Sequence, residues 1–194
     1  MKNLTIPYVT ENTSKGTKTS DVFSRLLEDR IVLLSGEIEN NLAKIIIAQL
    51  LFLDNQSHDE PINLYINSPG GSVVDGLAII DTMNLISAPV HTYCMGMCAS
   101  MGAMILSQGE KGHRYCLPNG EVMIHQPLGG AKGQATDIEI SANRIIKMKK
   151  KLIKMLSEAC NQDYEKVYSD CERDYYLDAE EALEYGIIDK VLKK

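Results

Sequence analysis

Hydrophobic residues in this chain follow strand-like and helix-like spacings in alternation. Ile62, Leu64 and Ile66 alternate with the more polar Asn63 and Tyr65, which predicts a half-buried strand over residues 62–66. Strands that alternate with helices favour stacked β-α units, so we predict a single α/β domain over residues 1–194. The other elements predicted in the first part of the chain are a polar segment over 10–21, a helix over 22–27, a strand over 30–34, a helix over 41–53 and a polar loop over 54–60.

The second half of the chain contains one predicted helix of unusual length. It runs from Gln134 to Cys160, and its apolar stripe consists of Ile138, Ala142, Ile145, Leu152 and Leu156. About 27 residues at 1.5 Å each span about 40 Å, more than a domain of this size covers, so we expect the helix to project. A shorter helix with frayed ends is the alternative. The lysines at 147, 149, 150, 151 and 154 are interpreted as a solvated face. A capping box at Asp178 and a stop at Gly186 predict a last, short helix.

Charge and cysteine content narrow the class of protein. The net charge is -6, which argues against nucleic acid as the main partner. The cysteines number five, and Cys94 and Cys116 lie in apolar strand patterns, so we expect reduced, buried thiols. The sequence contains no run of about 18 apolar residues, so it predicts no membrane span. The N-terminus lacks the apolar core of a secretory signal. We therefore expect a cytoplasmic protein.

One hydroxyl group lies where a predicted strand meets a predicted buried helix. Val90 to Cys94 has the pattern of a short strand, Gly96 allows a sharp turn, and an apolar helical pattern begins at Met101. Ser100 would then lie at a helix N-terminus, where free N–H groups favour negative charge. That position suits a nucleophile, because its oxyanion needs donors already in place. A plain N-cap is the alternative and is the commoner role of serine there.

A histidine follows a second predicted strand. His125 comes directly after the apolar residues at 122–124, and Pro127 with two glycines stops the strand. Imidazole, with an ordinary pKa of about 6.5, can accept a proton near neutral pH, so His125 is a candidate general base. A lone histidine is more often structural, but its pairing with Ser100 strengthens the catalytic interpretation. The other histidines, in a polar loop or in strand patterns, are interpreted as structural: His58, His91 and His113.

A glycine turn follows the strand at 62–66. Pro69, Gly70 and Gly71 form the turn, and Ser72 with Asp75 resembles the capped start of a helix over 73–86. The N–H groups of the two glycines would be open to a substrate carbonyl at this helix N-terminus. An ordinary tight turn before a helix is the alternative.

Together these segments resemble the proteolytic subunit of the Clp protease, the ClpP family of serine peptidases (family S14). The resemblance extends from about Ile6 to Leu192. Its most specific blocks are YINSPGG at 65–71, ASMG at 99–102, MIHQPLGG at 123–130 and GQATDI at 133–138. It implies a crotonase-like α/β fold, with residues 1–20 as an N-terminal axial segment and residues 134–160 as a handle helix that joins two seven-membered rings.

The resemblance also assigns roles to residues. It makes Ser100 the nucleophile, His125 the general base and Asp174 the third member of the triad, whereas the bare sequence leaves Asp170 and Asp178 as competitors. It implies an oxyanion hole from the N–H groups of Gly71 and Met101. Unfolded polypeptide would bind as an extended strand along residues Gly70, Gly71, Ser72, Val73, Leu128, Gly129 and Gly130. The implied activity is that of an ATP-dependent serine endopeptidase, without a metal or organic cofactor.

Further implications concern partners. Arg173 matches a family residue that contacts the opposite ring, in a homo-oligomer of two stacked heptamers. Side chains spaced two residues apart on three predicted strands also lie on one shared face of the sheet. The aromatic residues on this face could be ordinary packing. In the family that face binds a loop of a hexameric AAA+ ATPase of the ClpX, ClpA or ClpC type. The residues concerned are Asn63, Tyr65, Tyr93, Met95, Tyr115, Leu117 and Leu192.

The face departs from the family pattern at two positions. Asn63 replaces a usual tyrosine and Tyr93 a usual aliphatic residue, so we expect an unusual ATPase partner or affinity, or a second ClpP-like subunit in the assembly.

Two other functions are alternatives to the peptidase. A crotonase-type acyl-CoA enzyme is one alternative, although a serine nucleophile is foreign to that chemistry. A ring subunit that is inactive, or inactive alone, is the other, although all three triad positions are intact.

Overall fold

The computed structural model describes residues 6–14 and 16–193, so residues 1–5 of the predicted axial segment and Lys15 lie outside the described residues. The strands are β1 (Tyr8–Thr13), β2 (Gly16–Asp21), β3 (Ile31–Ser35), β4 (Ile62–Ser68), β5 (Val90–Ala99), β6 (Arg114–Cys116), β7 (Glu121–Ile124), β8 (Tyr175–Asp178) and β9 (Lys190–Val191). The helices are α1 (Val22–Glu28), α2 (Asn40–Gln56), α3 (Val73–Leu85), α4 (Met101–Ser107), α5 (Ala135–Cys160), α6 (Tyr164–Asp170) and α7 (Ala179–Tyr185).

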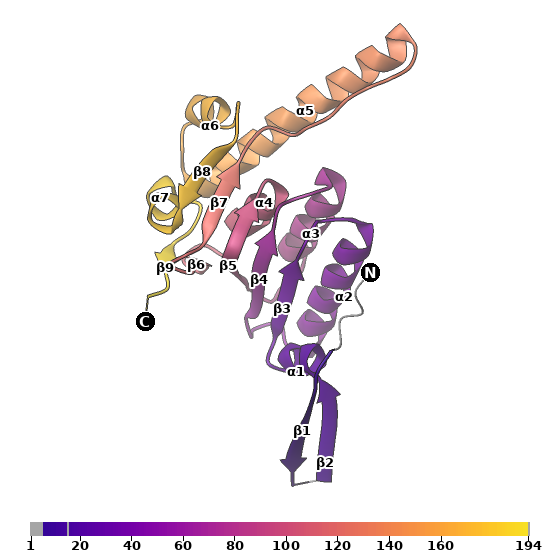
Figure 1. Ribbon diagram of the computed structural model, residues 1–194, viewed down its shortest axis with the longest axis vertical. Coiled ribbons are helices and arrows are strands. Elements are labelled where there is room, and N and C mark those ends of the chain that lie inside the picture. The colour runs from indigo at the N-terminus through magenta and orange to yellow at the C-terminus, as the bar shows by residue number, and fades with distance from the viewer. Residues whose placement is uncertain (1–5, 15, 194) are drawn as a thin grey trace.

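Most strands form one sheet whose members lie in the order β3-β4-β5-β6-β9, with β7 beside β5 and β8 beside β7. All pairs in this sheet are parallel except β7 with β8. The helices α2, α3 and α4 cover one face of it (Figure 1). Ile62, Leu64 and Ile66 of β4 are fully buried on that side, as the alternating pattern predicts. The predicted α/β fold class is therefore confirmed.

Strand β5 is longer than the predicted strand over 90–94. The sharp turn expected at Gly96 is wrong, because Gly96 lies within the strand at φ +90°. Between the pairs Ile66–Cys94 and Ser68–Cys98, two more residues fit into β5 than into β4, which makes a bulge. Before the bulge, β5 pairs with β6. After the bulge it pairs with β7, and the strand then ends directly before Ser100.

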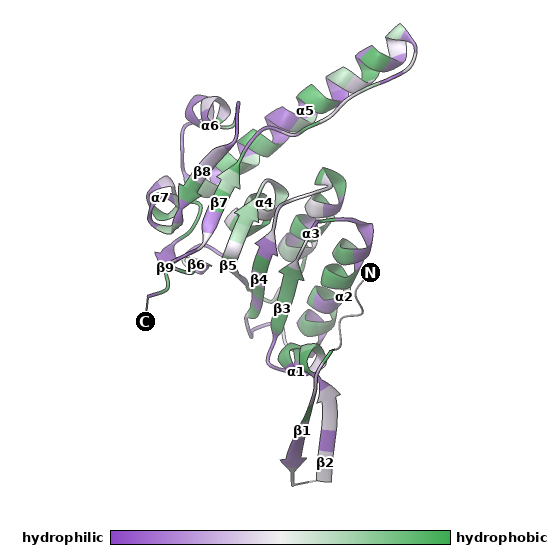
Figure 2. Cartoon of the chain, in the orientation of Figure 1, coloured by the Kyte–Doolittle hydropathy of each residue, from purple (hydrophilic) through white to green (hydrophobic). Residues whose placement is uncertain are grey.

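The segment over 10–21 forms a β-hairpin that the sequence did not predict. Strands β1 and β2 pair antiparallel and extend away from the sheet (Figure 1). Their side chains are mostly polar, as the pale and purple colours in Figure 2 show, so no hydrophobic alternation marks them. Polar cross-strand contacts, such as that between the hydroxyls of Thr10 and Thr19 at 3.1 Å, take its place.

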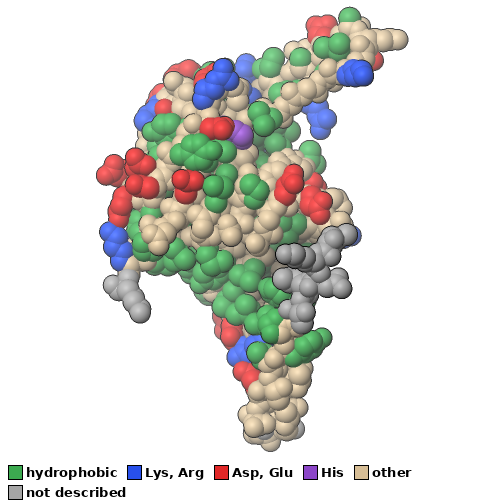
Figure 3. All heavy atoms as spheres, in the orientation of Figure 1, with side chains coloured by type: hydrophobic (Ala, Val, Ile, Leu, Met, Phe, Trp, Pro, Cys, Tyr) green, Lys and Arg blue, Asp and Glu red, His purple; other side chains and the backbone are tan. Residues whose placement is uncertain are grey.

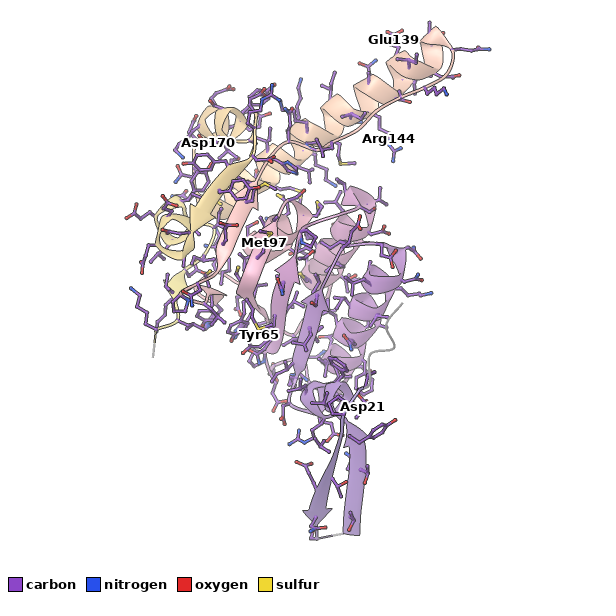
Figure 4. All side chains as sticks on the ribbon, viewed as in Figure 1. Asp21, Tyr65, Met97, Glu139, Arg144 and Asp170 are labelled. Atoms are coloured by element: carbon purple, nitrogen blue, oxygen red, sulfur yellow. The ribbon has the colours of Figure 1, made fainter. Side chains whose placement is uncertain are left out.

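Helix α5 projects from the body of the molecule (Figure 1). Its C-terminal half packs on the core through Leu152 and Leu156, which are buried. Its N-terminal half is exposed, and Ile140 is 62% accessible there. Figure 4 labels Glu139 and Arg144 on this free portion. Several apolar side chains on the first turns of α5, among them Ile138 and Ile140, are therefore left exposed by the described residues of the chain.

Two compositional expectations can be compared with the structure. All five cysteines are buried and free, which confirms the prediction of buried thiols without a disulfide framework. Among residues 6–14 and 16–193, no helix combines the length and apolar character needed to cross a bilayer.

A buried ion pair fastens the C-terminal end to the sheet. Arg114 on β6 donates to Asp189 from Nη2 at 2.6 Å and from Nε at 2.9 Å, and also to the carbonyl of Ala159 in α5. Burial by itself would raise the pKa of Asp189, but the hydrogen bonds and charge of Arg114 outweigh it, so the net shift is downward. The pair thus links β6, β9 and the end of the long helix.

Replacing Asp189 with asparagine should lower the free energy of unfolding by about 3 kcal/mol at pH 7, because it leaves the Arg114 charge buried without a counter-charge. Since the pKa of Asp189 is lowered in the folded state, its contribution is present above an unfolded-state pKa of about 3.9 and is lost as pH falls through the folded value. Urea denaturation at several pH values measures this. The difference between variant and wild type should shrink in acid, and Asp59→Asn in the exposed loop is the control. Equal stability of D189N and D59N at pH 7 would contradict it.

Candidate active site

The register of the sheet brings Ser100 and His125 to one edge. Ala99 of β5 lies opposite Met123 of β7 in the parallel pair. The residues that follow both strands therefore emerge at the same carboxyl edge, and the N–H of Ser100 donates to the carbonyl of Met123 at 2.8 Å. The Ser100 hydroxyl lies 2.9 Å from Nε2 of His125.

The antiparallel partner of β7 supplies the carboxylate. Ile124 lies opposite Tyr175 of β8, so the residue before Tyr175 lies opposite the residue after Ile124. That places Asp174 beside His125, and Oδ1 of Asp174 lies 2.9 Å from Nδ1 of the imidazole. With the Nδ1 proton donated to Asp174, the lone pair of Nε2 faces the Ser100 hydroxyl. The neighbouring candidates are engaged elsewhere, because Asp170 accepts from Tyr185 and Asp178 caps α7.

Burial differs sharply between His125 and Asp174. The His125 side chain is 13% accessible, whereas that of Asp174 is 56% accessible in the single chain. The imidazole is thus held within the protein, while its carboxylate partner lies at the surface. In a single chain the second hydrogen bond is therefore open to competition from water.

Ser100 has a backbone conformation that serine rarely adopts. Its φ is +54° and its ψ is -119°, outside the regions that L-residues favour, at a cost of about 1–3 kcal/mol. Although Ser100 occupies the N-cap position of α4, its side chain makes no capping hydrogen bond. The plain N-cap interpretation is therefore wrong, because the hydroxyl points to His125 instead of the helix.

The glycine turn lies against the serine. A Cβ atom on Gly70 would come within 2.6 Å of the Ser100 Cβ and 2.8 Å of the Ala99 carbonyl oxygen. Gly71 forms a bridge to Ile38, whose N–H donates to the Gly70 carbonyl and whose carbonyl accepts from Ser72. That bridge does not use the N–H of Gly71. Met101 is the first residue of α4, where the helix offers its N–H no partner.

An apolar pocket and a groove adjoin the serine. The pocket is lined by Ser100, His125 and the following residues: Val73, Met101, Met104, Ile124, Pro127, Leu152, Ile153, Leu156 and Cys171. The groove runs between the glycine turn and α5, where Gly71, Ser72, Val73, Leu128 and Gly130 of the predicted substrate strand line it with Arg144 and Ile145. Gly70 lies instead under Ser100, and Gly129 packs against Ile145.

Contacts that the sequence did not indicate hold the loop of Asp174. The backbone N–H of Gln126 donates to the Cys171 carbonyl at 2.6 Å, and its side chain donates to the Glu172 carbonyl at 2.9 Å. Lys149 forms an ion pair with Glu172 and lies over the Tyr168 ring. Lys149 is thus part of this support, and the solvated face predicted for it is wrong. Only the position of Gln126, directly after His125, could have suggested its role.

In a comparison with protein-family models, residues 14–194 match Clp protease. The chain belongs to the Clp protease family. The match covers nearly the whole chain and agrees with the parallel sheet and the long α5. Membership of this family displaces the acyl-CoA alternative, and it makes a peptidase site the relevant comparison for the serine, histidine and aspartate above.

The outer face of the sheet carries the aromatic residues that the sequence placed together. Tyr93 stacks on Tyr65 at 4.4 Å and on Tyr115 at 4.8 Å between ring centroids, and its hydroxyl donates to Asn63 at 2.9 Å. Tyr65 and Met95 also line a groove whose other wall comes from α1, β3 and α2. Figure 3 shows hydrophobic side chains gathered on the visible side of the body, above the polar hairpin.

Replacing Gly70 with alanine should slow the reaction of Ser100 with a fluorophosphonate at least about 100-fold, because the new Cβ displaces the serine by steric overlap and a misplacement of about 1 Å has an effect of that size. Gly70 also has a φ of +98°, so the matched control is Gly112→Ala, with a φ of +89° and no atom within 4 Å of the new Cβ. Labelling kinetics followed by mass spectrometry measure the effect. Equal rates in G70A and G112A would contradict it.

Proposed function

We propose that this Clp protease family member is a serine endopeptidase subunit that cleaves unfolded polypeptides with Ser100, His125 and Asp174. The observation that carries the proposal is the pair of 2.9 Å contacts that join the Ser100 hydroxyl to His125 and His125 to Asp174. These three groups are the nucleophile, the base and the orienting carboxylate that acyl transfer at a peptide bond requires.

The reaction begins with attack of the Ser100 oxygen on the peptide carbonyl carbon. Nε2 of His125 takes the hydroxyl proton and passes it to the departing amine, so the peptide C–N bond breaks and an ester with Ser100 forms. Water then attacks this ester, with His125 again as the base, and releases the acid and the free serine. Asp174 keeps the imidazole in the tautomer that accepts at Nε2 and stabilises the imidazolium.

The tetrahedral intermediate needs donors for its oxygen. We assign this role to the N–H groups of Gly71 and Met101, because neither is used by the bridge to Ile38 or by the first turn of α4. The strained backbone of Ser100 presents the hydroxyl at this point. The apolar pocket beside Ser100 would take the side chain on the acyl side of the scissile bond.

Substrate would bind as an extended strand in the groove between the glycine turn and the segment at 128–130. Main-chain hydrogen bonds of this kind tolerate many side chains, which suits cleavage of unfolded polypeptide. The residues proposed for this role are Gly70, Gly71, Ser72, Val73, Leu128, Gly129 and Gly130, of which Leu128 is strongly exposed in the single chain.

The proposed assembly is two stacked heptameric rings with α5 as the handle. The exposed apolar stripe on the free half of α5 supports it, because such a stripe is normally covered in the working molecule. Arg173 is exposed and its side chain has no hydrogen bond or ion pair with the described residues of its own chain, so it is available to an opposite ring. Covering the adjacent Asp174 would also remove competing water from the triad.

Replacing Arg173 with alanine should weaken the double ring and lower peptide hydrolysis together, by at least about tenfold, because assembly and the position of Asp174 depend on adjacent residues. Analytical ultracentrifugation and hydrolysis of a fluorogenic peptide on the same samples measure the two effects. Lys111→Ala, at an exposed position remote from Asp174, is the control. Full activity from a stable single ring would contradict this coupling.

We propose the outer aromatic face as the docking surface for a hexameric AAA+ ATPase of the ClpX, ClpA or ClpC type in the cytoplasm. The stacked tyrosines and the groove at Tyr65 and Met95 support it. The face also includes Asn63, Tyr115, Leu117 and Leu192. The hydrogen bond between Tyr93 and Asn63 makes it more polar than an aliphatic pocket, which favours an altered ATPase affinity or a mixed ring with a second ClpP-like subunit.

The proposed function is tested by hydrolysis of a short fluorogenic peptide and of an unfolded protein, each with and without the ATPase and ATP. Peptide cleavage by the chain alone and ATP-dependent cleavage of the protein are expected. A chain that cleaves only when mixed with a paralogous subunit would favour the hetero-oligomeric alternative. Absence of cleavage under every condition would overturn the proposal.

A further inference from the structure

Two histidines and a glutamate meet on the outer face of the sheet, at the opposite end of β5 from Ser100. His91 lies on β5, and His113 immediately precedes β6. Arg114, the first residue of β6, pairs with Thr92 of β5 in the parallel register, so His113 lies beside His91. The two imidazole rings stack with centroids 4.0 Å apart and planes at 4°. The backbone N–H of Glu110 donates to the Val90 carbonyl at 2.9 Å, which brings the glutamate to the same place.

The three side chains offer ligand atoms at nearly the spacing that a metal ion requires. Nε2 of His91 lies 3.4 Å from Oε2 of Glu110. Ligands at about 2.0–2.1 Å from a tetrahedral Zn²⁺ are about 3.3 Å apart, so this pair already has the right separation. One atom from each of His91, Glu110 and His113 lies within 4.8 Å of the others. Binding one ion also requires the two parallel imidazole rings to tilt toward each other and Glu110 to turn, because the lone pair of an imidazole nitrogen lies in the plane of its ring.

The surroundings of the imidazoles suit a cation. Nδ1 of His113 lies 2.9 Å from the Tyr115 hydroxyl, which leaves Nε2 for a ligand bond. A hydrogen bond on the second ring nitrogen is what orients histidines that bind metals.

We propose that His91, Glu110 and His113 bind one Zn²⁺ ion per chain. Two neutral imidazoles and a carboxylate are ligands that zinc favours, and a fourth position remains for water or a partner's side chain. No sequence motif indicates this site, because each histidine alone suits a structural role. The site adjoins Tyr115 on the outer face, and eight residues of β5 separate His91 from Ser100, so it does not depend on the peptidase reaction.

Titration of the untagged, full-length protein with Zn²⁺ alone, followed by isothermal calorimetry, tests the site. One saturable site per chain is expected, with an affinity at least tenfold weaker in His91→Gln, His113→Gln and Glu110→Gln. Tyr115→Phe should weaken binding by about 10–100-fold, since it removes the support of His113. Co²⁺ as a second probe should give a visible spectrum of nitrogen and oxygen ligands without sulfur charge transfer.

Two controls separate this site from other sources of binding. His58→Gln, in the exposed loop, should bind Zn²⁺ as the wild type does, and so should His125→Ala, which removes the imidazole beside Ser100. Binding lost in H125A but kept in H91Q would place the ion at the peptidase site and overturn the proposal. Absence of saturable binding, or equal affinity in all variants, would overturn it as well. Glu110→Gln has little structural role to lose, because the Glu110 side chain is about half exposed and its only ion pair among the described residues is with His91.

Discussion

Replacing Ser100 with alanine should lower the turnover of a fluorogenic peptide by about six orders of magnitude while the protein still folds and assembles. The loss corresponds to about 8 kcal/mol of activation free energy. It is this large because the serine, the histidine and the aspartate act as one unit, and without the hydroxyl no covalent intermediate forms. Alanine retains the Cβ atom, so packing against Gly70 is preserved.

The measurement needs a high enzyme concentration and a long time course, with the oligomer checked by ultracentrifugation. Ser87→Ala is the matched control, because Ser87 is exposed and uses only its backbone N–H, which donates to Asp54. It should keep full turnover. A Ser100→Ala protein that retained more than about one per cent of wild-type turnover would show that another group is the nucleophile.

Replacing Asp174 with asparagine should lower turnover by about four orders of magnitude. The amide keeps the size of the side chain, but its N–H₂ group can donate to Nδ1 and hold the imidazole in the tautomer that cannot accept from Ser100. The geometry that makes this possible is the 2.9 Å contact between Oδ1 and Nδ1. Steady-state kinetics should show the loss in kcat more than in KM, since Asp174 acts through its hydrogen bond to His125.

Asp170→Asn is the control for this change, because Asp170 lies four residues away and was its competitor on the bare sequence. Asparagine at 170 can still accept from the Tyr185 hydroxyl through its amide oxygen, so the fold should survive. Its turnover should stay close to that of the wild type. Equal losses in D174N and D170N would mean that the loop, and not one carboxylate, governs the activity.

Part of the site could be predicted from local sequence alone. Ser100 and His125 each follow an apolar strand, Ser100 directly before a helical pattern and His125 before a proline–glycine segment, and that local signal indicated their positions at strand ends. The glycine turn at Gly70 and Gly71 was equally plain. What local sequence could not give was the aspartate, because β8 is short and only its antiparallel register with β7 selects Asp174.

The parts that were missed depend on pairing between distant segments. The bulge at Gly96 exists because β5 exchanges β6 for β7 as its partner, and no residue near Gly96 reports on those strands. The hairpin of β1 and β2 lacks hydrophobic alternation because both of its sides are exposed. The meeting of His91 with His113 needs the same β5–β6 register, so two unremarkable histidines became a candidate metal site only in three dimensions.

The central claim is that Ser100 is a nucleophile activated by His125. It is tested most directly by reacting the assembled protein with a fluorophosphonate and locating the adduct by peptide mass spectrometry. We predict one adduct per chain, on Ser100, whose formation is lost in His125→Ala. An assembled wild-type protein that stays unlabelled, or carries the label on another residue, would contradict the account.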